Sequence, residues 1–169
     1  LEIGAICNNA KFKEDRSLKG KVKQVKNSLL GHKDNRDIIG DPTEGALILA
    51  ADDIGLNQKK LKSNFSEVLE IPFDSNRKRM SVIANKNKRY QLYIKGALDV
   101  LLERCDSYLD NAKVKKLTKD KKEKILKANK KLADQALRVL ACGYREIKGR
   151  LDKNNLDKYE DKIVFVGLV

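Results

Sequence analysis

The sequence has few of the residues that build catalytic triads, metal sites and disulfide networks. It contains one histidine, His32, and three cysteines, Cys7, Cys105 and Cys142. The cysteines are odd in number and widely spaced, and no C-x-x-C occurs, so we expect no zinc site or disulfide framework and a reducing compartment. His32 lies in a polar, lysine-rich segment, where we expect a solvated side chain rather than the base of a nucleophile.

Long apolar runs are also absent. No run approaches the roughly 18 residues that cross a bilayer, and the first ten residues contain Glu2 but no basic lead-in of a signal peptide. The chain has no initiator methionine, and residues 163–169 predict a buried strand that no cap or tail follows. We therefore expect a fragment of a larger protein.

Three common catalytic and nucleotide motifs are missing. No G-x-x-x-x-G-K-[ST] is present, which excludes a Walker-type phosphate loop. No G-x-G-x-x-G follows a predicted strand, and no G-x-S-x-G occurs. The acidic pair Asp52-Asp53 ends a predicted helix, where we expect solvated carboxylates rather than a metal site.

The net charge of +13 is confined to two segments. Residues 11–37 carry nine basic and four acidic residues, and residues 113–131 carry ten lysines and two acidic residues. Neither segment has more than one aromatic residue, so neither is a typical stacking platform for bases. We expect solvated surface segments, with 11–37 a surface excursion of weak local structure. The alternative is a basic module that binds nucleic acid.

The length and the 41% of hydrophobic residues indicate one folded domain over 1–169. Asp41-Pro42-Thr43-Glu44 predicts a helix start, because Asp41 can cap the first amides and proline suits the first helical position. Gly55 ends that helix. The region 90–95 alternates like a strand, with Tyr90, Leu92 and Ile94 on one face and Tyr93 on the other.

Further elements follow from the same patterns. We expect the tail of a helix at 1–7, strands at 68–72, 80–85, 138–147 and 163–169, and a short helix at 97–104. Thr118 caps a predicted helix to about Leu137, with an apolar stripe of Ile125, Leu132, Ala133, Ala136 and Leu137. A charged loop spans 148–162. The pattern predicts an α+β fold with a mainly antiparallel sheet whose helices cover one side.

Four short segments place groups compatible with a base or a phosphate at element boundaries: Thr43-Glu44, Phe73 to Met80, Lys95-Gly96-Ala97 and Arg138-Val139-Leu140. In this order, they resemble the nucleotide-binding domain of P-type ATPases, most of all the calcium-pump branch. Residues 40–47 are similar to the family's segment ahead of the pocket, and residues 73–81 to its adenine-stacking segment. K-G-A at 95–97 is similar to its signature, and residues 137–140 to its pocket-closing strand. The match covers roughly residues 38–147.

The resemblance implies a cytosolic domain of an integral membrane protein that captures ATP with Mg²⁺. Such a domain carries the γ-phosphate to an aspartate in a separate phosphorylation domain, and an actuator domain and transmembrane helices complete the pump. The D-K-T-G-T of that aspartate is absent, since Asp152-Lys153, Asp157-Lys158 and Asp161-Lys162 are not followed by Thr-Gly. We expect an ATP-binding module with no catalytic residue or metal ligand of its own and no nucleic-acid partner. It is an enzyme only within the full ATPase, and the resemblance to the calcium-pump branch favours calcium as the transported ion.

The resemblance also assigns roles in the pocket. It makes Phe73 the ring that stacks on adenine, for which the alternative is a core phenylalanine. It makes Glu44 the acceptor for the adenine amino group, although Glu44 is also the capping-box partner of Asp41. It makes Lys95 a positive charge inside the pocket, for which the alternative is a solvated lysine at a strand end. Gly96 and Ala97 lack bulk, so a planar ligand can lie close to their backbone.

The remaining assignments concern phosphates and pocket walls. Arg138 and Lys78 are candidates for phosphate contacts, whereas Met80 and Leu140 supply either apolar wall or core. Ser75 replaces an arginine that some calcium pumps carry, so phosphate affinity is lower or Arg77 compensates. Leu98 stands where many members have proline after K-G-A, and we expect it to leave binding intact.

Overall fold

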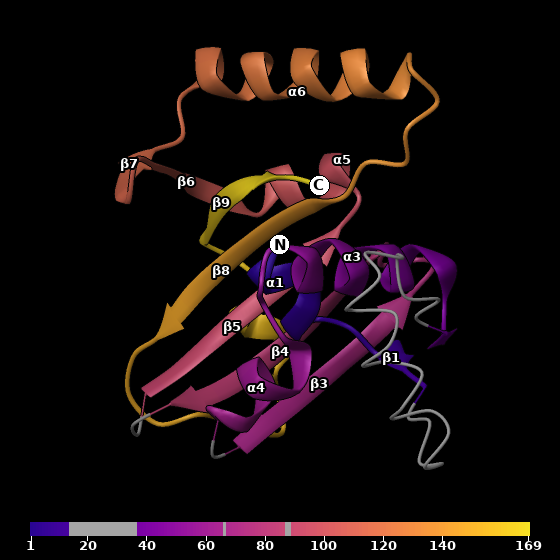
Figure 1. The fold of residues 1–169 in the computed structure, drawn as a ribbon. Helices are drawn as coiled ribbons and strands as arrows, with labels where there is room; N and C mark the ends of the chain where they lie inside the picture. The colour runs from indigo at the N-terminus through magenta and orange to yellow at the C-terminus, as the bar shows by residue number, and fades with distance from the viewer. Residues whose placement is uncertain (14–36, 66, 87–88) are drawn as a thin grey trace.

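A computed structural model describes residues 1–13, 37–65, 67–86 and 89–169 of the chain. The helices are α1 (Glu2–Ile6), α3 (Pro42–Asp53), α4 (Gln58–Ser63), α5 (Leu98–Glu103), α6 (Lys119–Ala133) and the 3₁₀ helix η1 (Asp157–Tyr159). The strands are β1 (Lys11–Phe12), β2 (Ile38–Ile39), β3 (Glu67–Asp74), β4 (Arg79–Lys86), β5 (Arg89–Gly96), β6 (Cys105–Asp110), β7 (Lys113–Lys116), β8 (Ala141–Ile147) and β9 (Ile163–Leu168). Figure 1 shows their arrangement.

One seven-stranded sheet in the order β3-β4-β5-β8-β9-β6-β7 forms the centre of the molecule (Figure 1). All neighbouring strands pair antiparallel except β6 and β9, which run parallel. β3 and β7 are the edge strands. The predicted α+β fold with a mainly antiparallel sheet is confirmed.

Helices cover both faces of this sheet, so the prediction of helices on one side is wrong. On one face, Leu92 and Ile94 of β5 lie in a core cluster with Leu101 of α5 and Ile125 of α6. On the other face, Met80 and Val82 of β4 cluster with Ile3 and Ile6 of α1, and Leu61 of α4 packs against them. The predicted alternation in β5 is confirmed, because Tyr90 packs on the first cluster and Tyr93 on the second.

The ends of α3 lie where the sequence places them. The Asp41 carboxylate accepts hydrogen bonds from the backbone N–H groups of Thr43 (2.8 Å) and Glu44 (3.2 Å). At the other end Gly55 has φ +82°, its N–H donates to Asp52 O, and Leu56 N–H donates to Ala51 O. This pair of bonds is a Schellman motif, which satisfies two carbonyls at the helix end.

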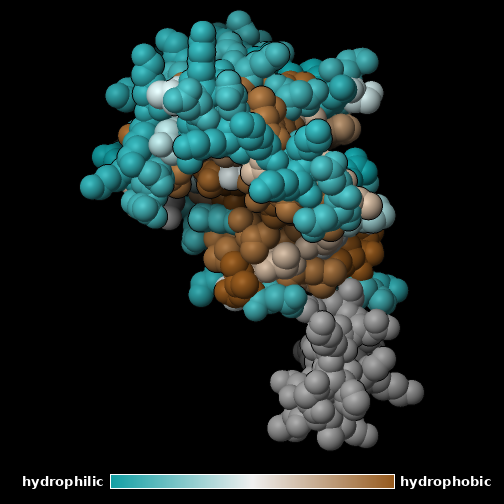
Figure 2. Space-filling view, turned by 90° about the horizontal axis from the view of Figure 1, so that it is seen from above, coloured by the Kyte–Doolittle hydropathy of each residue, from teal (hydrophilic) through white to brown (hydrophobic). Residues whose placement is uncertain are grey.

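Helix α6 is shorter and less buried than predicted. Thr118 caps it, but the helix ends at Ala133, and Ala136 has φ +57°. Ile125 is the buried member of the predicted stripe, whereas Leu137 is 52% exposed. The predicted stripe is therefore only partly confirmed: Ile125 is buried and Leu132 half-buried, whereas Ala133, Ala136 and Leu137 are exposed. Figure 2, from above, shows a hydrophilic surface over much of the molecule, with an apolar area in its lower part.

Several elements differ from the predictions in extent or existence. Strand β8 begins at Ala141, three residues later than predicted, although the backbones of Leu140 and Val169 exchange two hydrogen bonds beside it (2.7 and 2.9 Å). Helix α4 and the β6–β7 hairpin were not predicted. Most of the 11–37 excursion, including His32, lies outside the described residues. Its first two residues, Lys11 and Phe12, form β1 and pair with β2, which directly follows the excursion.

The cysteines Cys7, Cys105 and Cys142 are buried and unbridged. Burial raises the pKa of Cys105 to about 12 and that of Cys142 to about 11. The pKa of Cys7 is raised as well, again mainly by burial. Their thiols are protonated near neutral pH, which suits packing rather than nucleophilic or metal chemistry.

Among the described helices, none combines the length and the apolar character that a membrane span requires.

Candidate nucleotide site

The predicted site residues Lys95 and Glu44 meet in a largely buried ion pair. Lys95 ends strand β5, and its Nζ lies 2.7 Å from Oε1 of Glu44 in the first turn of α3. The side chains are 6% and 16% exposed. A solvated lysine at a strand end, the alternative to the pocket role, does not fit this burial. Two groups of opposite charge taken out of water together constrain each other's position strongly.

Glu44 is also held by the residues that follow α1. Its Oε2 accepts a hydrogen bond from Asn9 N–H (2.9 Å), and its backbone carbonyl accepts one from Nδ2 of Asn8 (2.9 Å). Asn8 is fully buried, and its Oδ1 accepts from Ala10 N–H. The Glu44 carboxylate thus binds Lys95 and Asn9 instead of completing a capping box with Asp41. Each carboxylate oxygen keeps a further lone pair.

Phe73 lies at the same end of the sheet. Ile71 pairs with Ser81 and Asp74 with Arg79, so a β-bulge leaves Pro72 and Phe73 together opposite Met80. Met80 in turn pairs with Lys95. Phe73 and Lys95 are therefore two strands apart in one row, roughly 10 Å between backbones. The Phe73 side chain is 58% exposed. Its large exposed ring suits a ligand surface and excludes the core phenylalanine that was the alternative interpretation.

Gly96 is required by the backbone that crosses it. A Cβ at Gly96 would lie 2.6 Å from the carbonyl oxygen of Lys78 and 2.7 Å from Cβ of Arg79. The same Lys78 carbonyl accepts a hydrogen bond from Ala97 N–H (3.0 Å). The small residues of K-G-A thus hold the β3–β4 turn against the end of β5. The exposed Lys78, with φ +51°, lies in that turn.

The other predicted residues divide into surface and core. Arg138 is exposed, and its charge contributes to the lowered pKa of Asp41, after the larger effect of the Glu44 N–H bond. Arg138 therefore lies near the start of α3, where Thr43 is half-buried. Leu140 is half-buried, whereas Met80 is 1% exposed and belongs to the core cluster. Met80, which lies between Phe73 and Lys95 in the row, is therefore a core residue.

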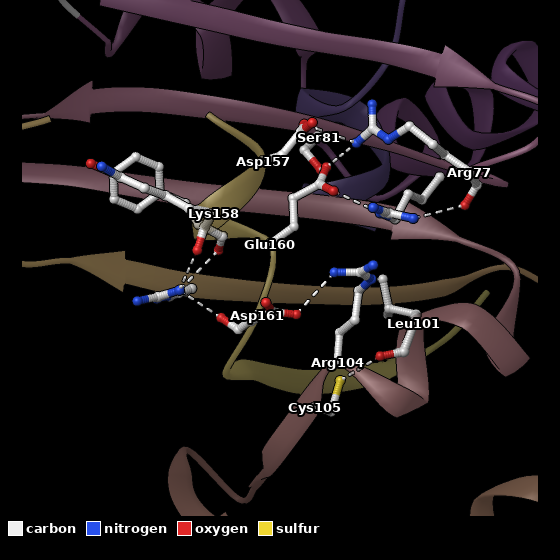
Figure 3. Close-up of polar contacts among 12 residues, drawn as sticks. Arg77, Ser81, Leu101, Arg104, Cys105, Asp157, Lys158, Glu160 and Asp161 are labelled. Carbon is white, nitrogen blue, oxygen red and sulfur yellow. Dashed lines mark hydrogen bonds and ion pairs between the residues drawn. The ribbon is translucent and has the colours of Figure 1, made fainter. Parts of the chain in front are cut away.

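A second ionic centre was not predicted from the sequence. Glu160 is fully buried and accepts hydrogen bonds from Arg77, from Nε of Arg79 (2.7 Å) and from Oγ of Ser81 (2.6 Å) (Figure 3). Burial favours the neutral acid, but the bonds from Ser81, Arg77 and Arg79 outweigh it and lower the pKa of Glu160. Arg77 also lies 3.7 Å from Asp157. For Arg77 to compensate for Ser75 at a phosphate, it would have to leave both carboxylates.

Signals for these additional residues are present but faint. Arg77, Arg79 and Ser81 recur with period two, which puts three donors on one face of a strand and calls for an acceptor there. Asn8 and Asn9 follow a short predicted helix. No cap or turn predicted from the neighbouring sequence explains two adjacent amide side chains there, which indicates partners elsewhere in the fold.

Two hollows lie away from the row of Phe73, Met80 and Lys95. One of about 640 Å³ is lined by Phe65, Arg89, Tyr93 and Tyr144 among others, and one of about 600 Å³ by Tyr90 and residues 150–154. Both are near the opposite end of β5. In the described ranges, no group of three or more His, Cys, Asp or Glu residues is placed to hold a metal ion.

Comparison with known proteins identifies the family of this domain. The family model of the P-type ATPase cytoplasmic domain N matches residues 1–169. The chain is 36% identical over 168 residues to calcium-transporting ATPase 1 of Lactococcus lactis, covering 99% of this chain and 17% of that protein. It is 36% identical over 135 residues to calcium-transporting ATPase 1 of Bacillus cereus, covering 80% of this chain and 15% of that protein.

A third relative is the calcium-transporting ATPase of Bacillus subtilis, 31% identical over 170 residues, which covers 99% of this chain and 17% of that protein. This chain thus spans about a sixth of the length of the relatives it matches. The family match covers every residue, and the α+β fold is consistent with it. The chain belongs to the family of P-type ATPase cytoplasmic N domains.

Proposed function

We propose that this domain binds ATP at the end of the sheet where β3 and β5 end, and presents the γ-phosphate to an aspartate of a separate domain. One observation carries the proposal: Lys95, which forms a buried ion pair with Glu44, shares a row of the sheet with the exposed Phe73. An aromatic face, a carboxylate acceptor and a fixed cation are the groups that an adenine nucleotide needs.

The residues divide the nucleotide between them. The Phe73 ring stacks on the base, and a free lone pair of Glu44 accepts from the adenine amino group. Guanine presents a carbonyl at that position, which a carboxylate rejects. Lys95 holds the Glu44 carboxylate in place at 2.7 Å and adds positive charge near the α-phosphate. Gly96 and Ala97 form the floor, Thr43 and Leu140 flank it, and Lys78 and Arg138 contact phosphate oxygens. The domain positions the nucleotide, and Mg²⁺ arrives with the phosphates.

The whole protein's activity is part of the same proposal. Relatives are named calcium-transporting ATPases, so we propose that this domain serves an ATP-driven cation pump, with calcium as the favoured ion. Its partners would be the phosphorylation and actuator domains of the same polypeptide. The domain would then lie on the cytosolic side of the cell membrane, joined to it through transmembrane helices.

Calorimetric titration of the 169-residue chain with ATP tests the binding. Replacing Phe73 by alanine removes stacking worth about 1–3 kcal/mol, so the Kd for ATP rises about five- to 150-fold. Val68→Ala is the matched control, since Val68 is 44% exposed on the same strand. Equal ATP affinity of Phe73→Ala and Val68→Ala would overturn the stacking assignment.

Nucleic-acid binding is the alternative that the exposed lysines of β7 and α6 suggest. Duplex binding that weakens steeply with salt, and that is lost when lysines between 113 and 131 are neutralised, would favour it. We expect no such binding, because Tyr108, which pairs with Lys115 of this segment, already has Lys121 over its ring at 4.5 Å.

A further inference from the structure

Glu160 connects the last loop of the chain to the turn that carries the site. It lies more than 78 residues from each of its partners in sequence, yet both of its carboxylate oxygens are bonded, Oε1 to Arg77 and Ser81 and Oε2 to Arg79. The carboxylate is completely excluded from solvent. Figure 3 shows its side chain reaching from the loop before β9 toward the strand that bears Ser81.

The loop that carries Glu160 is itself anchored. The Arg145 guanidinium of β8 donates to the backbone carbonyl oxygens of Asp161 (2.8 Å) and Tyr159 (3.3 Å). Arg104 Nη1 donates to the Asp161 carboxylate (2.9 Å), and Glu160 N–H donates to Asp157 O. The backbone on either side of Glu160 is thus fixed to the sheet and to the end of α5. The loop therefore presents Glu160 as a fixed acceptor to the turn between β3 and β4.

The turn between β3 and β4 transmits this hold to the site. Within it, Lys78 N–H donates to Asp74 O, and Asn76 and Arg77 N–H donate to the Asp74 carboxylate. Arg79 Nη1 donates to the carbonyl of Arg77 (3.1 Å). Phe73 directly precedes this turn. Glu160 holds both arginine guanidinium groups and therefore also holds the 74–79 turn. This turn follows Phe73 and contains the Lys78 carbonyl that contacts Ala97 of K-G-A.

The charges at this centre explain why one buried carboxylate suffices. Arg77 and Arg79 bring two positive charges, Glu160 one negative charge, and the exposed Asp157 stands 3.7 Å from Arg77. A glutamine in place of Glu160 would keep the shape but leave the buried Arg79 without a counter-ion. The two arginine side chains would then repel each other and move apart, and the turn that carries them would shift.

We propose that Glu160 is a positioning residue for the nucleotide site, which holds the 74–79 turn so that Phe73 and Lys78 stay in place to meet ATP. This inference rests on the proposed function above. It predicts that the turn loosens and nucleotide binding weakens together when the carboxylate is neutralised.

The test combines amide hydrogen exchange without nucleotide and titration with ATP and with adenosine. In Glu160→Gln we expect exchange at Asn76, Arg77 and Lys78 to accelerate, and the Kd for both ligands to rise roughly tenfold, because the binding-competent turn is populated less. Ser81→Ala removes one neutral donor and is expected to change both readouts in the same direction by less. It keeps the test decisive if Glu160→Gln does not fold.

Ile147→Val is the control, because Ile147 is a buried residue at the far end of β8, and its shortening weakens the fold without touching the turn. It should leave exchange in the turn and both Kd values unchanged. Unchanged turn exchange in Glu160→Gln and Ser81→Ala overturns the positioning role whether or not ATP binds. Faster exchange with an unchanged Kd, or tighter ATP binding from a released Arg77, also overturns it. Wild-type chain that binds neither ligand overturns the proposed function instead, while the exchange result still decides whether Glu160 holds the turn.

Discussion

Gly96→Ala tests the physical reason for the glycine of K-G-A. The added methyl carbon would lie 2.6 Å from Lys78 O, 2.7 Å from Arg79 Cβ and 2.9 Å from Arg79 Cα. Two of these atoms are backbone, and the third is fixed to it, so no side-chain rotation removes the overlap. The Lys78–Arg79 backbone must move away from β5, which also threatens the hydrogen bond from Ala97 N–H to Lys78 O.

The size of the effect follows from a comparison within the same sheet. Gly167 in β9 has no atom within 4 Å of an added Cβ, so Gly167→Ala introduces no clash. Both substitutions restrict the unfolded chain equally, which contributes about 0.4–1 kcal/mol of stabilisation to each and cancels in the difference. The remaining difference in the free energy of unfolding is the cost of overpacking, about 1–3 kcal/mol against Gly96→Ala.

Urea denaturation of the two variants, monitored by circular dichroism, measures this difference. ATP titration of the same samples should show weaker binding for Gly96→Ala, because the turn next to Phe73 shifts. Unfolding free energies within about 0.5 kcal/mol of each other would refute the close backbone contact. The remaining reason for a glycine at position 96 would then be close approach of the ligand to its backbone.

Three further changes probe the other parts of the site. Lys95→Met leaves the Glu44 carboxylate without its buried partner, so we expect a loss of about 3–5 kcal/mol of unfolding free energy in urea melts, partly recovered when Glu44→Gln is added. Folding lowers the pKa of Glu160 from its ordinary value of 4.5, so in acid the unfolded chain binds a proton at this residue before the folded chain does. The unfolding free energy therefore falls as the pH is lowered through this range. Glu160→Gln should make that fall less steep, measured by urea melts between pH 3 and pH 6. Lys124→Gln with Lys127→Gln, on the exposed side of α6, should change the Kd for ATP less than about twofold at moderate salt, since exposed charges on another element are screened.

Local signals in the sequence were sufficient for the elements with strong boundaries. Asp41 and Gly55 mark the ends of α3 through a cap and a left-handed residue, and both work through neighbours less than five residues away. The alternation of Tyr90 to Ile94 gives the two faces of β5 because each face is buried in a different cluster. The prediction that Phe73, Glu44 and Lys95 form one site came from the family resemblance and not from any local pattern.

The elements that escaped prediction lack such signals. The β6–β7 turn has Asn111 and Ala112 at φ +45° and +63°, and alanine gives no hint of a left-handed turn. Every residue of β7 is exposed, so no alternation marks it as a strand. Leu137 continues the helical spacing of α6 although the helix ends at Ala133. The spacing gives no sign of the left-handed backbone conformation at Ala136. Glu160 depends on partners about 80 residues away, which no window of sequence covers.

The two edges of the sheet also bear on how this domain behaves at high concentration. An unpaired edge is a template for a strand of another copy, and natural sheets protect it with lysine, proline or a bulge. β7 offers Lys113, Lys115 and Lys116, all exposed, while β3 carries Pro72 within its bulge. Charge repulsion at one edge and a missing N–H donor at the other thus oppose edge-to-edge aggregation. The lysines of β7 thus keep copies of the chain apart, a role that requires no ligand.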